Sequence, residues 1–300
     1  MKSLGNQEST GFMYGLLGII GFSLTLPATK IAVSAFDPMV VGVGRALPAA
    51  VIAGIVLLVG KQRLPRREEI RSLCMVVLGV IIGFPYLSSW AMERVPVSHG
   101  AIVNAMLPLA TAGAAAIFAR ERPSRGFWLA SAAACAAVLG FSFREGSGGF
   151  QLADLALGGA VVSAAIGYAE GAKLTRTMGS WQVISWALVF SFPVLLIPVT
   201  VQLHADMLAA PLDVWLSFGY VSLISQFVAF IAWYRGLAVG GVARVSQIQY
   251  LQPFFTMAAS ALLLSENITP STIVVAMIVL AAVAAGKRSA VQVSLSGKNG

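Results

Sequence analysis

Two prolines in different halves of the chain, Pro108 and Pro253, have matching polar neighbours within otherwise apolar stretches. Residues at −7, −4 and +3 from each proline are small or polar, and this spacing places them on one face of a helix. The amides one turn before the prolines, Asn104 and Gln249, can both donate and accept hydrogen bonds. We therefore expect both amides, together with Ser246, to contact a small molecule in a shared central cavity. The alternative is hydrogen bonding between packed helices.

The same prolines predict bends in the chain. A proline within a helix removes one backbone donor and frees the carbonyl four residues earlier. Pro108 and Pro253 lie near the middle of their apolar stretches, and Pro27 interrupts the first stretch. We expect all three prolines to act in gating, with Pro27 as a hinge.

Aromatic side chains predict the wall of the cavity. Tyr86 and Trp90 are one helical turn apart beside Pro85, so they can line one side, and Tyr168 can face them. Trp186 is a further candidate. An aromatic pocket with few charges suits an amphipathic small molecule. The alternative for such residues is a place in the interfacial belt of a membrane protein.

Two charged residues fall inside apolar stretches, where charge is costly and commonly functional. Arg45 could pair with a substrate carboxylate, or it could snorkel or bond carbonyls freed near Pro48, which we favour. Glu170 could couple transport to protons, or it could form an i,i+3 pair with Lys173, which we favour.

Catalytic and metal-binding motifs are missing from the sequence. It contains two histidines, no HExxH, no Walker sequence and no GxGxxG opening a helix. The two cysteines, Cys74 and Cys135, lie within apolar stretches without CxxC spacing. We therefore expect neither an enzyme nor a bound metal or cofactor.

Composition describes the elements that must hold these residues. Charged residues make up 11% of the chain, against about 25% in soluble domains, and hydrophobic residues make up 58%. This excludes a soluble globule and a disordered chain. Runs of about 20 apolar residues predict an all-α integral membrane protein with ten transmembrane helices. They lie near 11–34, 38–59, 72–92, 98–118, 126–143, 155–172, 181–201, 213–234, 243–265 and 269–286.

The basic residues orient these ten spans. With both termini cytoplasmic, 16 of the 20 Lys and Arg residues fall on the inner side, as the positive-inside rule requires. The net charge of +8 therefore reflects topology, and we expect no nucleic-acid partner. The expected partners are the lipid bilayer of a bacterial inner membrane and a small-molecule substrate. We treat the chain as a monomer.

An internal repeat divides the ten spans. Pro108 and Glu121 recur as Pro253 and Glu266 with the same separation. Five spans per copy is an odd number, so the second copy must be inverted in the membrane, and inverted copies suit alternating access. The predicted division is a first five-helix repeat at 1–145, a second at 150–288 and a cytoplasmic tail at 289–300.

These features together resemble the drug/metabolite transporter superfamily, and specifically its EamA-type ten-helix exporters. The resemblance covers nearly the whole chain. It rests on the glycine-rich first span, Arg45, the Val95-Pro96-Val97 turn and the two segments that run from Pro108 to Glu121 and from Pro253 to Glu266. Within the superfamily the chain looks most similar to amino-acid exporters of the YddG type. The resemblance implies secondary export of small metabolites, most often amino acids, aromatic and other neutral ones included.

Other functions remain as alternatives at this point. A carrier of the same fold could move quaternary ammonium compounds, which would call for a buried acid, or sugar nucleotides, which would call for several basic residues. A channel is a further alternative, although the sequence has neither rings of charge nor a carbonyl-filter motif.

Overall fold

The computed structural model describes residues 2–118, 129, 132–133, 136–137 and 151–287. Within these residues every regular element is a helix. The α-helices are α1 (Lys2–Ser23), α2 (Thr25–Ala32), α3 (Ala46–Val59), α4 (Arg67–Val76), α5 (Phe84–Arg94), α6 (Val97–Asn104), α7 (Leu107–Phe118), α9 (Leu152–Met178), α10 (Ser180–Val201), α11 (Leu212–Gly219), α12 (Ala229–Gly240), α13 (Val242–Val245), α14 (Gln252–Leu264) and α15 (Pro270–Lys287). Five segments have π or 3₁₀ geometry, namely η1 (Val40–Gly44), η2 (Val77–Gly83), η3 (Ala205–Ala209), η4 (Tyr220–Val228) and η5 (Ser246–Leu251).

Among the described residues, seven helical stretches are long and apolar enough to cross a membrane, and they coincide with seven of the ten predicted spans. They are Ser9–Ala32, Val40–Val59, Arg67–Arg94, Val97–Phe118, Leu152–Met178, Ser180–Val201 and Leu212–Gly240. The predicted span 243–265 contains a shorter apolar helix, Ile248–Leu264, and the predicted span 269–286 coincides with α15. The predicted span 126–143 lies largely outside the described residues.

Regular α-helical geometry is broken directly before Pro108 and Pro253. α7 begins at Leu107 and α14 begins at Gln252, so each new segment starts directly before its proline. Proline is tolerated in the first turn of a helix, because its missing N–H would have no partner there. Upstream of the two breaks, α6 begins at Val97 and α13, which η5 separates from α14, begins at Val242. These two starts are separated by the same length of chain as the two prolines.

Three of the membrane-length helices contain a π-helical segment. η2 and η4 begin at Val77 and Tyr220 and so occupy corresponding places in the third and eighth predicted spans. η1 ends at Gly44, directly before Arg45. A π turn inserts one residue into the helical repeat and changes which side chains face inward, and such turns are frequent at functional sites.

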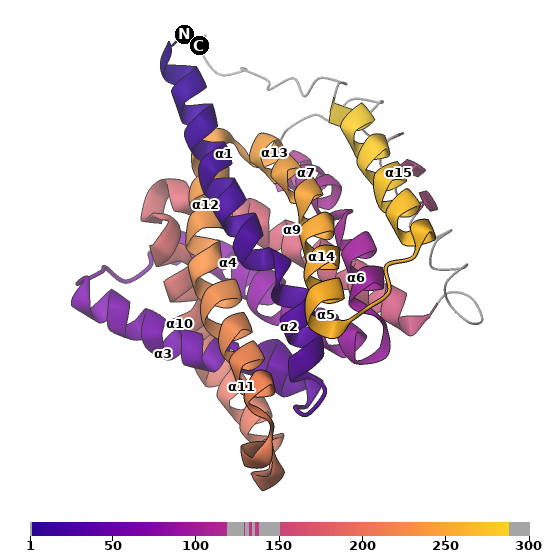
Figure 1. Ribbon diagram of the computed structural model, residues 1–300. Coiled ribbons are helices and arrows are strands. Elements are labelled where there is room, and N and C mark those ends of the chain that lie inside the picture. The colour runs from indigo at the N-terminus through magenta and orange to yellow at the C-terminus, as the bar shows by residue number, and fades with distance from the viewer. Residues whose placement is uncertain (1, 119–128, 130–131, 134–135, 138–150, 288–300) are drawn as a thin grey trace.

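α1 and α12 lie side by side along much of their length (Figure 1). Small residues allow this close approach: a Cβ atom added to Gly11 would come within 2.6 Å of the Cα of Gly240. Gly18 meets the backbone of Trp233 in the same way. Close packing of small residues is a main source of helix association in membranes. Figure 1 also shows α1 beginning and α15 ending at the same end of the bundle.

The corner between α5 and α6 is held from both sides. The Nζ atom of Lys30 donates to the carbonyls of Met92 and Val95, at 2.7 and 3.1 Å, near the end of α5. The carboxylate of Glu266 accepts from the first two backbone N–H groups of α6, at 2.8 and 3.1 Å. Each charge has the sign that the helix dipole favours at that terminus. The corner thus connects α2 to the segment that follows α14.

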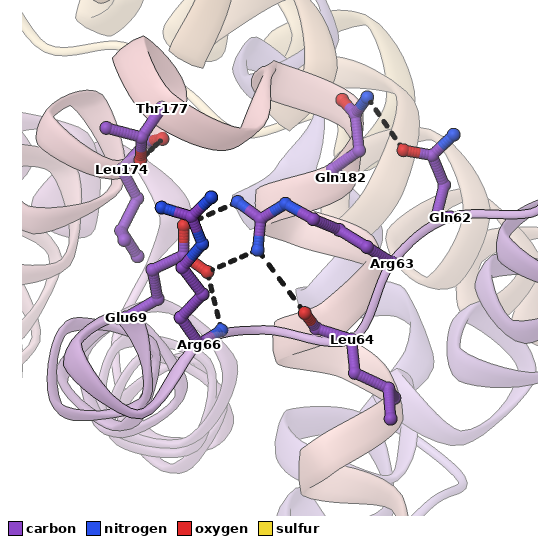
Figure 2. Close-up of polar contacts among 8 residues, drawn as sticks. All are labelled: Gln62, Arg63, Leu64, Arg66, Glu69, Leu174, Thr177 and Gln182. Atoms are coloured by element: carbon purple, nitrogen blue, oxygen red, sulfur yellow. Dashed lines mark hydrogen bonds and ion pairs between the residues drawn. The ribbon is translucent and has the colours of Figure 1, made fainter.

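The loop after α3 is fixed by a second polar network (Figure 2). Arg63 donates to both carboxylate oxygens of Glu69, at 2.7 and 2.8 Å, and Glu69 also accepts from the backbone N–H of Arg66 at 2.7 Å. This carboxylate therefore caps the start of α4. Gln182 of α10 donates to Gln62 at 3.2 Å, which ties the loop to α10.

Candidate functional site

A buried cavity lies where the interrupted helices, the π-helical segments and α9 meet. About 20 Å³ of the space inside it can hold the centre of a water molecule. That is enough for about one ordered water, so the helices are closed around it. The lining residues are Phe22, Thr25, Leu26, Arg45, Val80, Phe84, Asn104, Ala164, Tyr168, Ser225, Phe230 and Gln252.

Arg45 is the only charged residue among these lining residues. Its side chain is 2% exposed, and its Nε and Nη1 atoms have no hydrogen-bond partner among the described residues. A cation in an apolar interior costs several kcal/mol unless it is paired. Of the two interpretations made from the sequence, the bonding of freed carbonyls has no hydrogen bond to support it. The geometry instead leaves an unpaired cation at the cavity.

Amides and hydroxyls supply the remaining polar lining. Asn104 is the last residue of α6, and neither atom of its amide has a partner among the described residues. Gln252 is the first residue of α14. The hydroxyls of Thr25 and Ser225 share a hydrogen bond of 2.8 Å, which joins α2 to η4. The breaks in the two helices thus present polar groups to the cavity, as broken helices do in many transporters.

Aromatic rings form the apolar part of the site. Phe22 and Phe230 both line the cavity, with ring centroids 4.9 Å apart in an edge-to-face arrangement. Tyr168 also lines the cavity and packs against Trp233, with centroids 5.5 Å apart. The lining thus combines aromatic rings with a few polar groups, which is the usual composition of a small-molecule pocket.

Two of the residues predicted to contact the substrate, Asn104 and Tyr168, therefore meet at one cavity, together with Arg45, for which a structural role was favoured. The other predicted contacts lie elsewhere. Gln249 is 1% exposed within η5 and its amide has no partner among the described residues, while Ser246 is fully buried. Neither of the two lines the cavity.

The aromatic residues predicted to form one wall of the cavity do not lie together. Tyr86 and Trp90 are partly buried against the hydrophobic core and lie outside the cavity lining. The guanidinium of Arg94 lies 3.8 Å from the ring centroid of Trp90, a cation–π contact. Trp186 packs on Phe190, with centroids 5.7 Å apart.

Pro27 lies just after a break in the first span, between α1 and α2. Because Pro27 has no N–H, the carbonyl of Ser23 lacks its helical donor. That carbonyl accepts a hydrogen bond of 2.8 Å from the Thr256 hydroxyl of α14. The break in the first span is therefore tied to the helix segment that begins at Gln252. Pro108 and Pro253 are both buried.

Glu170 is buried in α9, outside the cavity lining. The Nζ atom of Lys173 lies 3.6 Å from its Oε2 atom, which is within ion-pair range but beyond a hydrogen bond. The side chain of Lys173 is mostly exposed. This is the i,i+3 geometry expected for a pair along one helix.

Sequence reasoning missed four prominent lining residues: Phe22, Thr25, Phe230 and Gln252. In helices that are apolar on every side, an inward-facing Phe or Thr looks like a lipid-facing or packing residue. The π turns also shift the inward face away from the ordinary helical period. One signal was present for Gln252, because it is a polar residue directly before the repeated Pro253.

Comparisons with known proteins agree with this architecture. The model of the EamA-like transporter family matches the chain twice, over residues 9–143 and 151–285. The uncharacterized transporter YdeK of Bacillus subtilis (strain 168) is 42% identical over 286 residues, which cover 95% of this chain and 99% of the relative. A probable terminal-alkyne amino-acid exporter of Streptantibioticus cattleyicolor is 24% identical over 267 residues, covering 86% of this chain and 87% of that protein.

A solved structure gives the same picture at the level of the fold. The crystal structure of a protein that is 14% identical matches with a TM-score of 0.67, covering 94% of this chain and 100% of the other. The arrangement of helices is thus shared well beyond detectable sequence likeness.

Proposed function

The chain belongs to the EamA-like transporter family and is a multi-pass membrane transporter, and from this premise we propose that it exports amino acids. The substrates are aromatic and other neutral amino acids, moved by secondary transport through alternating access. The relatives are bacterial, which fits an inner-membrane location.

One observation carries the proposal, namely the polar groups without partners in a cavity built from both family matches. Phe22, Arg45 and Asn104 belong to the first match, and Tyr168 and Gln252 belong to the second. A site between two repeats can open to either side when one repeat moves against the other. Its polar groups suit the charged end of an amino acid, and its rings suit an apolar side chain.

The proposed topology has ten spans in two inverted five-helix repeats, at 1–145 and 150–288, with both termini and the tail at 289–300 in the cytoplasm. The matched helix breaks and the matched π segments, which recur at nearly one spacing along the chain, support the repeat. The name of the relative from Streptantibioticus cattleyicolor, an amino-acid exporter, supports the substrate class.

The alternatives fit the cavity less well. A quaternary ammonium ion would need a carboxylate, and no Asp or Glu is found among the lining residues. A sugar nucleotide would need several cations for its phosphates, and the described lining supplies one. An open channel would need a continuous water path, whereas the cavity holds room for about one water.

Counterflow in proteoliposomes tests the proposal. Purified protein is reconstituted into vesicles that contain one unlabelled neutral amino acid, and uptake of a labelled amino acid is followed against empty vesicles. We expect saturable uptake that exceeds equilibration only when the vesicles are preloaded. Absence of counterflow across a panel of neutral and aromatic amino acids would contradict the proposal.

A further inference from the structure

Arg45 has no counter-ion in the part of the chain that the structure describes. It forms no ion pair there, two of its three guanidinium nitrogens have no hydrogen-bond partner, and it is 2% exposed. A buried cation without a partner is costly in a protein that crosses a membrane. An anion that enters the cavity would remove that cost, so the empty protein favours an anionic ligand group.

The rest of the cavity adds to this preference for an anion. Gln252, the first residue of α14, adds the amide of its side chain, which can donate hydrogen bonds. Asn104 offers an amide N–H₂ group without a partner. A cationic group of a ligand finds no carboxylate, because the described lining contains no Asp or Glu.

From this asymmetry we propose that Arg45 is the anchor for a carboxylate, and that the amino group of the substrate is dispensable. The inference rests on the proposed function and widens its substrate class. The substrate class becomes monocarboxylates with an apolar or aromatic body, of which neutral amino acids are only one part. The planar guanidinium matches a carboxylate through two parallel hydrogen bonds. The rings of Phe22 and Phe230 receive the apolar body.

Binding must widen the cavity, since its present space suits about one water. The segments that border it can yield, because Arg45 follows η1, Val80 lies in η2, and Ser225 lies in η4. A ligand shifts the equilibrium between the narrow and the widened cavity only if it makes better contacts in the widened one. The pairing of Arg45 with a carboxylate supplies those contacts.

If the substrate needs only a carboxylate, its transport should depend on the membrane potential. A monocarboxylate without an amino group leaves the cell with one negative charge, so an inside-negative potential drives its export. At about 100 mV, this potential holds the outside concentration of the carboxylate roughly 50-fold above the inside concentration at equilibrium. A zwitterionic amino acid carries no net charge and gains nothing from the potential. Imposing the potential with potassium and valinomycin should therefore accelerate efflux of the carboxylate and leave phenylalanine efflux unchanged.

Three matched compounds test the recognition rule on the parent protein. Phenylalanine carries both groups, 3-phenylpropionate carries only the carboxylate, and phenethylamine carries only the amine. We expect 3-phenylpropionate to inhibit phenylalanine counterflow with an affinity within about tenfold of phenylalanine itself, and phenethylamine not to inhibit. Inhibition by phenethylamine, or failure of 3-phenylpropionate to inhibit, overturns the inference.

The outcomes separate this inference from the proposed function. Phenylalanine counterflow that 3-phenylpropionate does not inhibit leaves amino-acid transport standing and removes the carboxylate rule. If phenylalanine shows no counterflow, direct counterflow of labelled 3-phenylpropionate decides the inference: saturable flux supports it, and no flux overturns it. The proposed amino-acid substrates then fail on their own.

Variants of Arg45 provide a second readout. Arg45→Gln should raise the apparent Kd for 3-phenylpropionate at least tenfold, measured as loss of the ligand-induced shift in melting temperature. Arg45→Lys should retain part of the affinity, because lysine keeps the positive charge but lacks the planar pair of donors of a guanidinium. Because Arg45→Gln removes an unpaired buried charge, its melting temperature without ligand should not fall. Arg94→Gln, an exposed arginine outside the cavity, is the matched control. Unchanged affinity in Arg45→Gln overturns the inference, and if that variant does not fold, the three-compound comparison decides.

Discussion

At the scale of single residues, the two repeated amides differ in what surrounds them. Asn104 and Gln249 occupy the same position relative to their prolines, yet only Asn104 lines the cavity. α6 keeps α-helical geometry up to Asn104, whereas Gln249 lies in the 3₁₀ segment η5. A 3₁₀ turn has fewer residues per turn, so the side chains rotate relative to an α-helix. The repeat in sequence is therefore not a repeat in environment.

This difference predicts unequal effects of matched substitutions. Asn104→Leu removes a hydrogen-bonding group from the cavity and should lower transport about tenfold, as expected when about 1.4 kcal/mol of binding is lost. Gln249→Leu should have a smaller effect. Initial rates of counterflow, normalised to reconstituted protein, measure both. An equal loss in the two variants would favour the symmetrical cavity that the sequence suggests.

Glu170 permits a test of proton coupling. Its carboxylate lies outside the cavity and faces Lys173 along the same helix, so we expect Glu170→Gln to keep the parent's pH profile of transport. The measurement is the transport rate between pH 5 and 8 in both proteins. A pH dependence that disappears in Glu170→Gln contradicts the prediction. A dependence common to both proteins directs attention to the buried pair of His99 and Asp154, whose side chains are 2.6 Å apart.

The site was predictable where a residue breaks the apolar pattern. Asn104 and Arg45 are conspicuous in the sequence because amide and charged groups are rare within membrane spans. Phe22 and Phe230 do not stand out in the sequence, because a phenylalanine in a membrane span can face lipid as readily as a cavity. The role of Arg45 could not be decided either, because its lack of a partner is a property of the folded neighbourhood.

At the scale of elements, the helices were predictable from hydropathy and their interruptions were not. A run of about 20 apolar residues is a direct consequence of bilayer thickness, and seven of the predicted spans are long apolar helices in the structure. The π segments have ordinary apolar sequences, such as Val77–Gly83. In η2, Gly79 approaches Gly167 of α9 closely, a tertiary contact that the local sequence does not reveal.

The break before Pro27 predicts a hinge. Pro27→Ala restores a backbone N–H that can bond the Ser23 carbonyl and compete with the Thr256 hydroxyl. The first span should then straighten, and exchange between states should slow. We expect the maximal counterflow rate to fall several-fold while the half-saturating concentration changes little, both read from concentration series. Thr256→Val, which removes the other partner of the same carbonyl, is the companion variant. Unchanged kinetics in both variants would contradict a hinge role.

At the scale of the whole molecule, the charges of the loops predict which end of the bundle faces the cytoplasm. The loop between α3 and α4 is rich in cations, whereas η3, which joins α10 to α11, contains Asp206. The positive-inside rule places the first of these loops in the cytoplasm. Gln182, near the start of α10, donates to Gln62 of that loop, so α10 begins on the same side. Because α10 crosses the membrane once, we expect η3 on the outer side.

Single cysteines introduced at two exposed acidic positions test this orientation. In a background with Cys74 and Cys135 replaced by serine, Asp206→Cys should react with a membrane-impermeant maleimide in intact cells. Glu68→Cys should react only after the membrane is opened. Both residues are exposed acids, so the two variants are matched in charge change and access. The reverse pattern would invert the proposed topology. Reaction of both cysteines in intact cells would place the two loops on one side and remove the inverted repeat.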